Sequence, residues 1–458
     1  MIDKKNIDIL ESSISKQEIR VDIKRHFFVI SSFHLTISCF ILAFATDGLG
    51  FTFLGLPLFT TISTLFIYLA LMIQIATHNI RLPKILAIVF AYIFIQTFIV
   101  NAFTISFFSS FKTFIGLILF SISIFSFVSV YRNRIVEIIR IYFRYVFIIA
   151  CLGILQSILF LFFKISFIPQ NIISGTLVVG GRNFFLPEIF GILPRAVGLS
   201  SEPASYAIGI LPGVYIALLI LTGKVSLLGI YERFMSKIIL IGFILSFSIV
   251  GYFGLLLCLL SIFTNKFKAN LLANVSIILF FVGALYVISQ TTLMSKVTTL
   301  PTMISGASDY EFESSDLTGF ALVSNVAVAR EGLIKSHYLG TGLNTHKDTY
   351  DQIIYKIFSK SQVILELNRE DAGSLFIRLA SEFGIPGIML FLFFLYRYRL
   401  GKDCSTSITK YINGMCLVSI ISFSVRNGSY LSVFFFFFLA LYYYTYIVQQ
   451  NNLKTIDS

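Results

Sequence analysis

The sequence predicts an all-α polytopic integral membrane protein, and three observations support this prediction. Of the 458 residues, 57% are hydrophobic and only 13% are charged, whereas soluble domains are roughly 45–50% apolar and about 25% charged. Apolar runs recur along the chain, and each crossing of a hydrocarbon layer takes about 20 apolar residues. Lys and Arg gather in alternate connections between these runs, as in the cytoplasmic loops of membrane proteins. This composition excludes an ordinary soluble enzyme.

The apolar runs predict about twelve transmembrane segments, some of them short or broken. The runs occupy residues 27–45, 58–77, 85–102, 114–131, 141–163, 204–221, 238–263, 271–289, 385–396, 412–423 and 431–448. The first run could be a secretory signal, because Ala43-Phe44-Ala45 resembles a cleavage site. A polar tail precedes it and further spans follow, so we expect an uncleaved anchor.

The distribution of basic residues predicts a cytoplasmic N-terminus. Basic residues occur before the first run (Lys4, Lys5, Lys16, Arg20, Lys24 and Arg25), after the second (Arg81 and Lys84) and after the fourth (Arg132, Arg134, Arg140 and Arg144). The turns after the first and third runs, residues 46–56 and 103–111, contain neither Lys nor Arg. Positively charged loops face the cytoplasm, so the chain begins inside.

The segment 237–264 determines the topology of the second half of the chain. Its flanks are both basic, with Lys237 before it and Lys266 after it. Two short arms broken near Gly251 keep every short basic loop inside, whereas a single crossing would place Arg399 outside. We therefore expect a broken hairpin and two cytoplasmic termini.

These assignments divide the chain into seven regions. They are a cytoplasmic tail (1–26), transmembrane segments 1–5 (27–165), a first large external loop (166–202), segments 6–9 with the hairpin (203–291), a second large external loop (292–371), segments 10–12 (372–448) and a second cytoplasmic tail (449–458). We expect both large loops to contain short helices.

A cation stands just before the sixth apolar run. The motif Ser200-Ser201-Glu202-Pro203 opens this run. A serine would cap the helix, the glutamate would complement its dipole and the proline suits its first turn. These helix-start signals do not explain Arg195, a cation near the positive end of a helix. An anion held between Arg195 and the helix N-terminus explains it. Arg182 is a second candidate for this anion, or an interfacial anchor.

The second external loop offers further polar candidates. His337 and His346 are candidate bases, although surface histidines are the simpler interpretation. Arg330 is a candidate substrate ligand, and pairing with its neighbour Glu331 on a solvated face explains it equally well. The intervening Gly340-Thr341-Gly342 predicts a tight turn and is too weak a pattern to predict a phosphate-binding loop.

Ionisable residues continue into the next span. Arg378 and Glu382 lie four residues apart, so on a helix they share a face and can form an ion pair. Ionisable residues at membrane depth are costly and usually face protein or a water-filled site. Arg378 is therefore a candidate substrate ligand, with an interfacial amphipathic turn as the alternative. Arg426-Asn427-Gly428, between the last two runs, is interpreted as a turn, with an anion contact as the alternative.

Together these motifs resemble the Wzy-type O-antigen polymerases of the O-antigen polymerase/ligase superfamily. The resemblance rests on two motifs within residues 140–400: Arg195, Gly198, Glu202 and Pro203, then Ser374, Arg378, Glu382, Gly384 and Gly387. The related ligases carry an H-N-x-x-L motif where this chain has Asp371-Ala372-Gly373-Ser374-Leu375. That difference favours a polymerase and leaves the identity of the base open.

The resemblance implies an integral-membrane C-type glycosyltransferase of the bacterial inner membrane. It would join undecaprenyl-pyrophosphate-linked oligosaccharide repeat units at the periplasmic face and release undecaprenyl pyrophosphate. Arg195, with Arg182, Arg378 or Arg330, would bind the pyrophosphate, and Glu202, His337 or His346 would serve as the base. The implied partners are a flippase and a polysaccharide chain-length regulator in the same membrane, with no nucleic acid.

We expect neither a cofactor nor a metal. None of the five cysteines has a CxxC or metal-ligand spacing, and arginines can stabilise a departing diphosphate without an ion. An O-antigen ligase and a lipid-linked oligosaccharide flippase or other transporter are the alternatives. A transporter would be expected to show repeated halves, and we find none. A scaffold protein would not need cations at the external face.

The charge pattern predicts which face carries each loop. We expect Glu313 and Lys335 outside and Lys266 and Arg399 inside. Single cysteines placed at these positions of a cysteine-free chain would be labelled in intact cells with a membrane-impermeant reagent. Labelling at 399 without labelling at 313 would contradict the predicted hairpin and the resulting topology.

Overall fold

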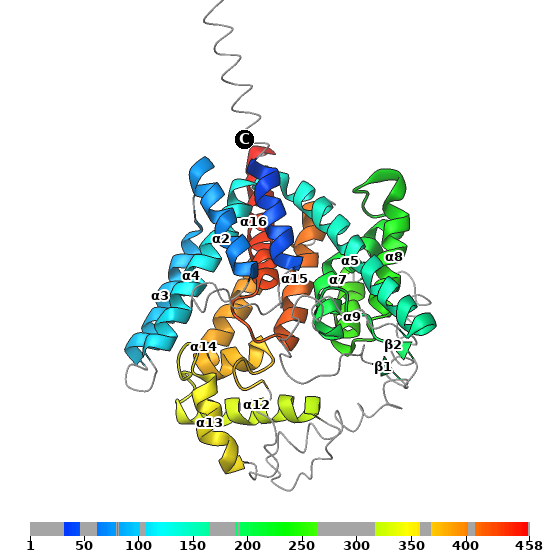
Figure 1. The fold of residues 1–458 in the computed structure, drawn as a ribbon. Helices are drawn as coiled ribbons and strands as arrows, with labels where there is room; N and C mark the ends of the chain where they lie inside the picture. The colour runs from blue at the N-terminus through cyan, green and yellow to red at the C-terminus, as the bar shows by residue number, and fades with distance from the viewer. Residues whose placement is uncertain are drawn as a thin grey trace, which may run out of the picture.

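The protein is described by a computed structural model. It covers residues 32–45, 62–78, 80, 82–100, 107–164, 188–189, 193–200, 202–263, 317–357, 368–401 and 408–456. In this part of the chain the structure is almost entirely helical (Figure 1). The exception is an antiparallel pair of two-residue strands, β1 (Glu188–Ile189) and β2 (Leu193–Pro194). It lies in the first predicted external loop, where we expected short helices.

The helices follow one another along most of the described chain. In order they are Ser32–Ala45, α2 (Ile62–Thr77), α3 (Lys84–Phe94), the π-helix η1 (Ile95–Val100), α4 (Phe107–Val130), the 3-10 helix η2 (Arg132–Arg134), α5 (Ile135–Phe163), α7 (Pro203–Leu221), the 3-10 helix η3 (Gly229–Tyr231), α8 (Glu232–Ile244), α9 (Ile249–Phe263), α12 (Leu317–Lys335), α13 (His346–Ile357), α14 (Leu375–Arg397), α15 (Ile408–Arg426) and α16 (Val433–Ile456).

Six helical stretches in the described residues are long and apolar enough to cross a membrane. They are Phe107–Val130, Arg132–Phe163, Pro203–Leu221, Leu375–Arg397, Ile408–Arg426 and Val433–Asn452. Shorter apolar helices lie beside them. The full set of about twelve crossings stays a prediction, and the predicted tail 1–26 and run 271–289 lie outside the described residues. α16 extends to Ile456, so most of the predicted C-terminal tail is helical.

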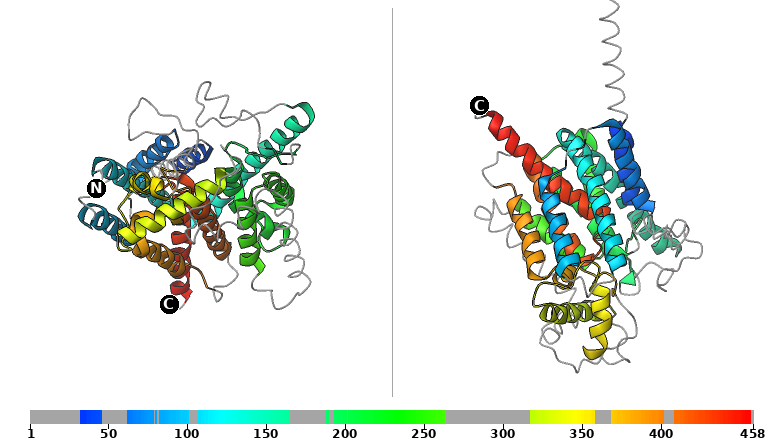
Figure 2. Two further views of the ribbon diagram at one scale, coloured as in Figure 1. Left: turned by 90° about the horizontal axis from the view of Figure 1, so that it is seen from below. Right: turned by 90° about the vertical axis from the view of Figure 1, so that its left-hand side faces the viewer.

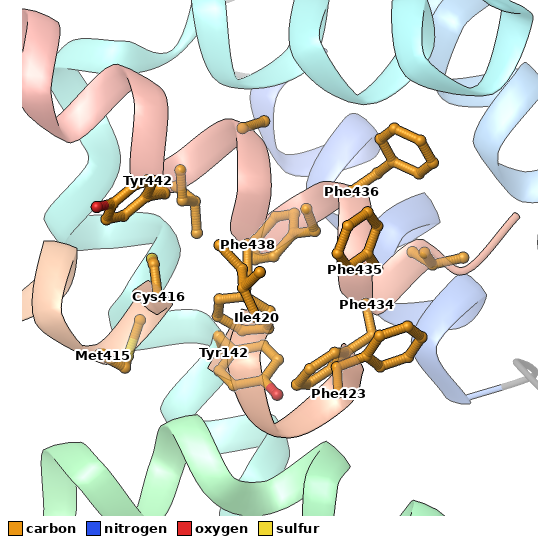
Figure 3. Close-up of a cluster of buried hydrophobic side chains, with 14 of the residues drawn as sticks. Tyr142, Met415, Cys416, Ile420, Phe423, Phe434, Phe435, Phe436, Phe438 and Tyr442 are labelled. Carbon is orange, nitrogen blue, oxygen red and sulfur yellow. The ribbon is translucent and has the colours of Figure 1, made fainter. Parts of the chain in front are cut away.

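The core of the bundle is built around α16. Its run of five phenylalanines, residues 434–438, is at most 8% exposed at every position. A helix that is apolar on all sides must be surrounded by others, and α16 packs against both α4 and α15. Phe423 of α15 stacks on Phe434, and Tyr142 of α5 meets Phe438 edge-on (Figure 3). This aromatic cluster holds the membrane-length helices together.

The segment predicted as a broken hairpin consists of two helices, α8 and α9. The turn between them occupies residues 245–248, a few residues before the predicted break at Gly251. Near the start of α7, the Tyr206 hydroxyl donates a hydrogen bond to the Gly242 carbonyl, at the end of α8. Just beyond the end of α7, Lys224 Nζ donates to the Ile262 carbonyl at the end of α9. α8 therefore runs antiparallel to α7 and α9 parallel to it, so the start of α8 and the end of α9 lie at one end of the bundle.

α12 and α13 form a separate layer at the other end of the bundle. α12 lies across the ends of the vertical helices, far from the C-terminus (Figures 1 and 2). It packs against both α13 and α14. Val328 of α12 and Tyr350, Ile353 and Ile354 of α13 form a small core of their own. We call this end of the molecule the α12–α13 end.

α14 is interrupted at Gly384, which adopts φ 62° and ψ −159°. This backbone conformation is essentially restricted to glycine. The break frees the carbonyls of Ser381 and Glu382, and these accept hydrogen bonds from the backbone N–H groups of Thr341 and Gly342 at 3.0 and 2.8 Å. Irregular backbone in a membrane-length helix is tolerated when protein satisfies it in this way. The Gly340-Thr341-Gly342 turn therefore has a structural function.

A side chain from a third element completes this junction. Gln96, on the π-helix η1, donates from Nε2 to the carbonyls of Glu382 and Leu339 at 2.9 and 3.1 Å. Gly340 faces Gly384 across the junction, and a Cβ on either residue would lie within about 2.5 Å of the opposing backbone. The two glycines thus permit the close approach of the turn and the broken helix.

We expect Gly384→Ala to destabilise the protein by roughly 3 kcal/mol, since it adds backbone strain to steric overlap. The added Cβ would overlap the Tyr338 carbonyl oxygen. The measurement is thermal unfolding of detergent-purified protein. The control is Gly209→Ala in α7, where a Cβ meets nothing within 4 Å and should be neutral or stabilise by up to about 1 kcal/mol. Equal unfolding temperatures for the two variants would refute this account of the break.

Candidate functional site

The loop that carries Arg195 is fixed by a buried glutamine. Gln156 of α5 accepts from the Gly198 N–H at 2.8 Å and donates to the Gly198 carbonyl at 2.7 Å. Gly198 has a left-handed φ of +57°, and a Cβ there would lie 2.7 Å from the Tyr206 ring. These contacts explain why a glycine follows Arg195 by three residues. The loop is therefore held against α5 and α7 at Gly198.

The side chain of Arg195 is half-buried where this loop meets the α8–α9 turn. The neighbouring Ala196 N–H donates to the Leu245 carbonyl at 2.9 Å. Within the described part of the chain, the one hydrogen bond of Arg195 runs from Nε to the Ser246 carbonyl at 3.4 Å. Both terminal nitrogens of its guanidinium therefore have no partner among the described residues. Burial lowers the pKa of Arg195, and the Glu202 carboxylate acts in the opposite direction, but an arginine remains protonated.

Glu202 is the N-cap residue of α7, a position that we had predicted for Ser200 or Ser201. Its side chain makes no capping hydrogen bond, and Pro203 follows in the first turn as predicted. The carboxylate instead forms an ion pair with Arg426 at 3.0 Å, and both side chains are 28% exposed. It also accepts from the Ser205 hydroxyl at 3.2 Å. Glu202 is therefore held by two partners and still reaches solvent.

We call Arg195, Glu202, Ser205 and Arg426 the Glu202 cluster. Two guanidinium groups stand against one carboxylate, so the formal charge of the cluster is positive. The N-terminus of α7 adds a partial positive charge at the same place. A partly exposed site with excess positive charge and unused guanidinium donors suits a phosphate or another anion.

Arg378 occupies a different environment, buried inside the protein at 6% exposure. Its Nε donates to Glu382 Oε1 at 3.0 Å, Nη1 to the Gly428 carbonyl at 3.0 Å and Nη2 to Asn344 Oδ1 at 3.2 Å. Its guanidinium carbon also lies 4.2 Å from the centre of the Tyr430 ring. We call these five residues the Arg378 node. Arg378 is thus occupied by protein partners and serves as a positioning residue in this structure.

His346 belongs to the buried surroundings of the Arg378 node. Its backbone N–H donates to Glu382 Oε1 at 3.3 Å, and its Nε2 is hydrogen-bonded to Asn325 Oδ1 at 2.8 Å. Asn325 Nδ2 donates to the Ala321 carbonyl, so the histidine is the donor in its pair with Asn325. Burial, with the nearby Arg378 charge, lowers the pKa of His346 to about 3. A neutral, buried imidazole of this kind is a poor base at neutral pH.

The remaining predicted site residues lie apart from the Glu202 cluster. His337 is exposed in the turn after α12, with a left-handed φ of 50°. Arg330 is exposed on α12 itself. Arg182 lies outside the described residues. Of the predicted site residues, the structure therefore brings together Arg195 with Glu202 and, separately, Arg378 with His346.

Sequence reasoning did not identify Arg426 as a site residue. It lies 224 positions from Glu202 along the chain, and no local pattern reveals this pairing. The available signal was a cation at the end of an apolar run, which we interpreted as part of a turn, with an anion contact as the alternative. Arg426 also joins the Glu202 cluster to the Arg378 node, because Gly428 and Tyr430 of the node lie two and four residues after it.

Comparisons of the chain with models of protein families, with curated proteins and with solved structures found no match. Among the described residues, no group of three or more His, Cys, Asp or Glu side chains could hold a metal ion.

Proposed function

We propose that this protein is an integral-membrane glycosyltransferase that polymerises undecaprenyl-pyrophosphate-linked oligosaccharide repeat units. The observation that supports this function best is the Glu202 cluster. It places the unused guanidinium donors of Arg195 within the electrostatic reach of the partly exposed Glu202 carboxylate, at the end of a bundle of membrane-length helices. A lipid diphosphate attached to a sugar requires this combination of a cation, a base and a membrane surface.

In the proposed reaction, a sugar hydroxyl of one repeat unit attacks the anomeric carbon of the growing chain. The new glycosidic C–O bond forms as the bond to the pyrophosphate oxygen breaks, and undecaprenyl pyrophosphate leaves with the electron pair. Arg195 stabilises the negative charge on the leaving group, which is an electrostatic contribution made mainly in the transition state. The hydroxyl proton passes to a base.

Of the three candidate bases, Glu202 is favoured because it lies in the same cluster as Arg195. Arg426 and Ser205 would orient its carboxylate, as a base in an active site requires. His346 is buried and neutral, and His337 is on the turn after α12. The Arg378 node would hold the loop that follows Arg426 and so position this arginine at the end of α15. No step in this scheme requires a metal ion.

The distribution of charge supports an external position for the α12–α13 end. At the opposite end, Arg134 lies over the Phe33 ring and Arg140 donates to the Leu227 carbonyl. Lys224 is at the same end, just after α7. By the positive-inside rule this end would face the cytoplasm. The Glu202 cluster would then face the periplasm of a bacterial inner membrane, where repeat units are joined.

We expect Arg195→Ala to abolish polymer and Arg195→Lys to lose most of it, because an ammonium cannot replace the planar guanidinium fork. The assay is polysaccharide banding after each variant is returned to a strain that lacks this gene. Membranes from this strain complemented with the unsubstituted gene, supplied with lipid-linked repeat units, should form polymer in the presence of EDTA. Arg233→Lys, an exposed substitution at the opposite end, is the matched control.

Banding also separates the possible functions. Loss of a polymerase leaves products with a single repeat unit, whereas loss of a ligase or flippase leaves lipopolysaccharide core without any repeat unit. Full-length polymer in the deletion strain would refute the proposed function. Full-length polymer in a well-expressed Arg195→Ala variant would refute the proposed site. Loss of activity in EDTA that magnesium restores would show that a metal takes the part assigned to the arginine.

A further inference from the structure

The end of α12 and the turn that follows it expose several large apolar side chains. Ile334, Tyr338 and Leu339 are 47%, 53% and 49% exposed. They lie within residues 334–340, which we call the Tyr338 turn. In a soluble layer such residues would be expected to face its small core, but this core consists of Val328 and residues of α13. The turn therefore points its apolar groups away from the layer to which it belongs.

The Tyr338 turn is attached to membrane-length helices and not to the α12–α13 layer alone. The Ile385 N–H donates to the Tyr338 carbonyl at 3.0 Å, and Gln96 of η1 donates to the Leu339 carbonyl at 3.1 Å. Ile385 on α14 is 46% exposed and Ile99 on η1 is 62% exposed. The exposed side chains of the turn thus continue an apolar surface of the bundle.

The same surface extends along α14. Met389, Leu392 and Phe393 are 65%, 50% and 57% exposed on a helix long enough to cross a membrane. Large apolar side chains exposed on a membrane-length helix face lipid. Because the Tyr338 turn is hydrogen-bonded to the first half of this helix, it lies beside the lipid-facing surface.

The backbone of the turn is held in an uncommon conformation. His337 and Tyr338 are consecutive left-handed residues, with φ of 50° and 66°. The Ser336 hydroxyl accepts from the Gly340 N–H at 3.0 Å and closes the turn. Left-handed non-glycine residues are energetically costly and persist only where surrounding contacts impose them. Here that geometry presents Tyr338 outward.

The side chains of the turn are those found at a membrane–water interface. Tyrosine is enriched in this layer because it combines an apolar ring with a polar hydroxyl. Lys335 and His337 are also exposed in the turn, and a lysine can extend its charged end to the headgroups while its stem stays in lipid.

We propose that the Tyr338 turn inserts into the interfacial layer of the bilayer and anchors the α12–α13 layer to the membrane surface. The ligand is the lipid itself, at the boundary of headgroups and acyl chains. This inference depends on the membrane-length bundle and is independent of the proposed glycosyltransferase activity.

The absence of tryptophan from the chain permits a direct test. Tyr338→Trp and, separately, Leu339→Trp place a single fluorophore in the turn. Phe393→Trp on α14 is the control for lipid exposure. Lys356→Trp, on an exposed position of α13, is the control for water exposure. Each full-length variant is reconstituted in nanodiscs with ordinary phospholipid, or with phospholipid brominated near the carbonyl end of its acyl chains.

We expect brominated lipid to quench the fluorescence of Tyr338→Trp and Leu339→Trp at least as strongly as that of the lipid-exposed control. Aqueous iodide should quench both variants much less than the α13 control. Quenching by iodide at the level of the α13 control, without quenching by brominated lipid, would overturn the proposal. Shielding from both quenchers would also overturn it, since the turn would then be covered by protein, such as a second copy of the chain.

Discussion

The buried ion pair between Arg378 and Glu382 is the interaction on which the α12–α13 end of the structure depends. Removing both charges from water costs several kcal/mol per ion, which the pair offsets only if its other donors and acceptors are satisfied. Glu382 accepts from the backbone of Asn344 and His346, while Arg378 donates to Asn344 and to Gly428. One pair thereby fixes α14, the start of α13 and the loop between α15 and α16. Its side chains are 8% and 0% exposed, so little water is available to replace a lost partner.

The interruption of α14 makes this arrangement possible. A continuous helix would use the carbonyls of Ser381 and Glu382 internally, whereas the break at Gly384 presents them to the turn at residues 340–342. Gln96 adds a donor from η1, and π-helical segments of this kind are frequent at functional sites. The cost of irregular backbone at membrane depth is thus offset by contacts from distant parts of the chain. The same contacts place Arg426, through its neighbours Gly428 and Tyr430, beside Glu202.

Local and periodic features of the fold could be predicted from the sequence. The apolar runs predicted membrane-length helices. The spacing of Arg378 and Glu382 predicted their ion pair, because residues four apart on a helix lie on the same face. Pro203 at the start of α7 follows from its fixed φ. The candidate site was harder to predict from the sequence. The pairing of Glu202 with Arg426 and the burial of His346 depend on contacts across many residues, which a single sequence does not encode locally. The sequence also could not show which arginine has free donors, because this depends on burial. In the structure Arg378 is enclosed by protein partners, whereas Arg195 keeps unused donors.

The central claim is that the Arg378–Glu382 pair acts as a unit, and a double-mutant cycle measures this most directly. Arg378→Met, Glu382→Leu and the double variant would be purified in detergent and compared for free energy of unfolding with the unsubstituted protein. Each single substitution leaves one buried charge unpaired and should cost about 3–5 kcal/mol. The double variant should lose no more than either single variant, because no unpaired charge remains. Losses that simply add in the double variant would contradict the account.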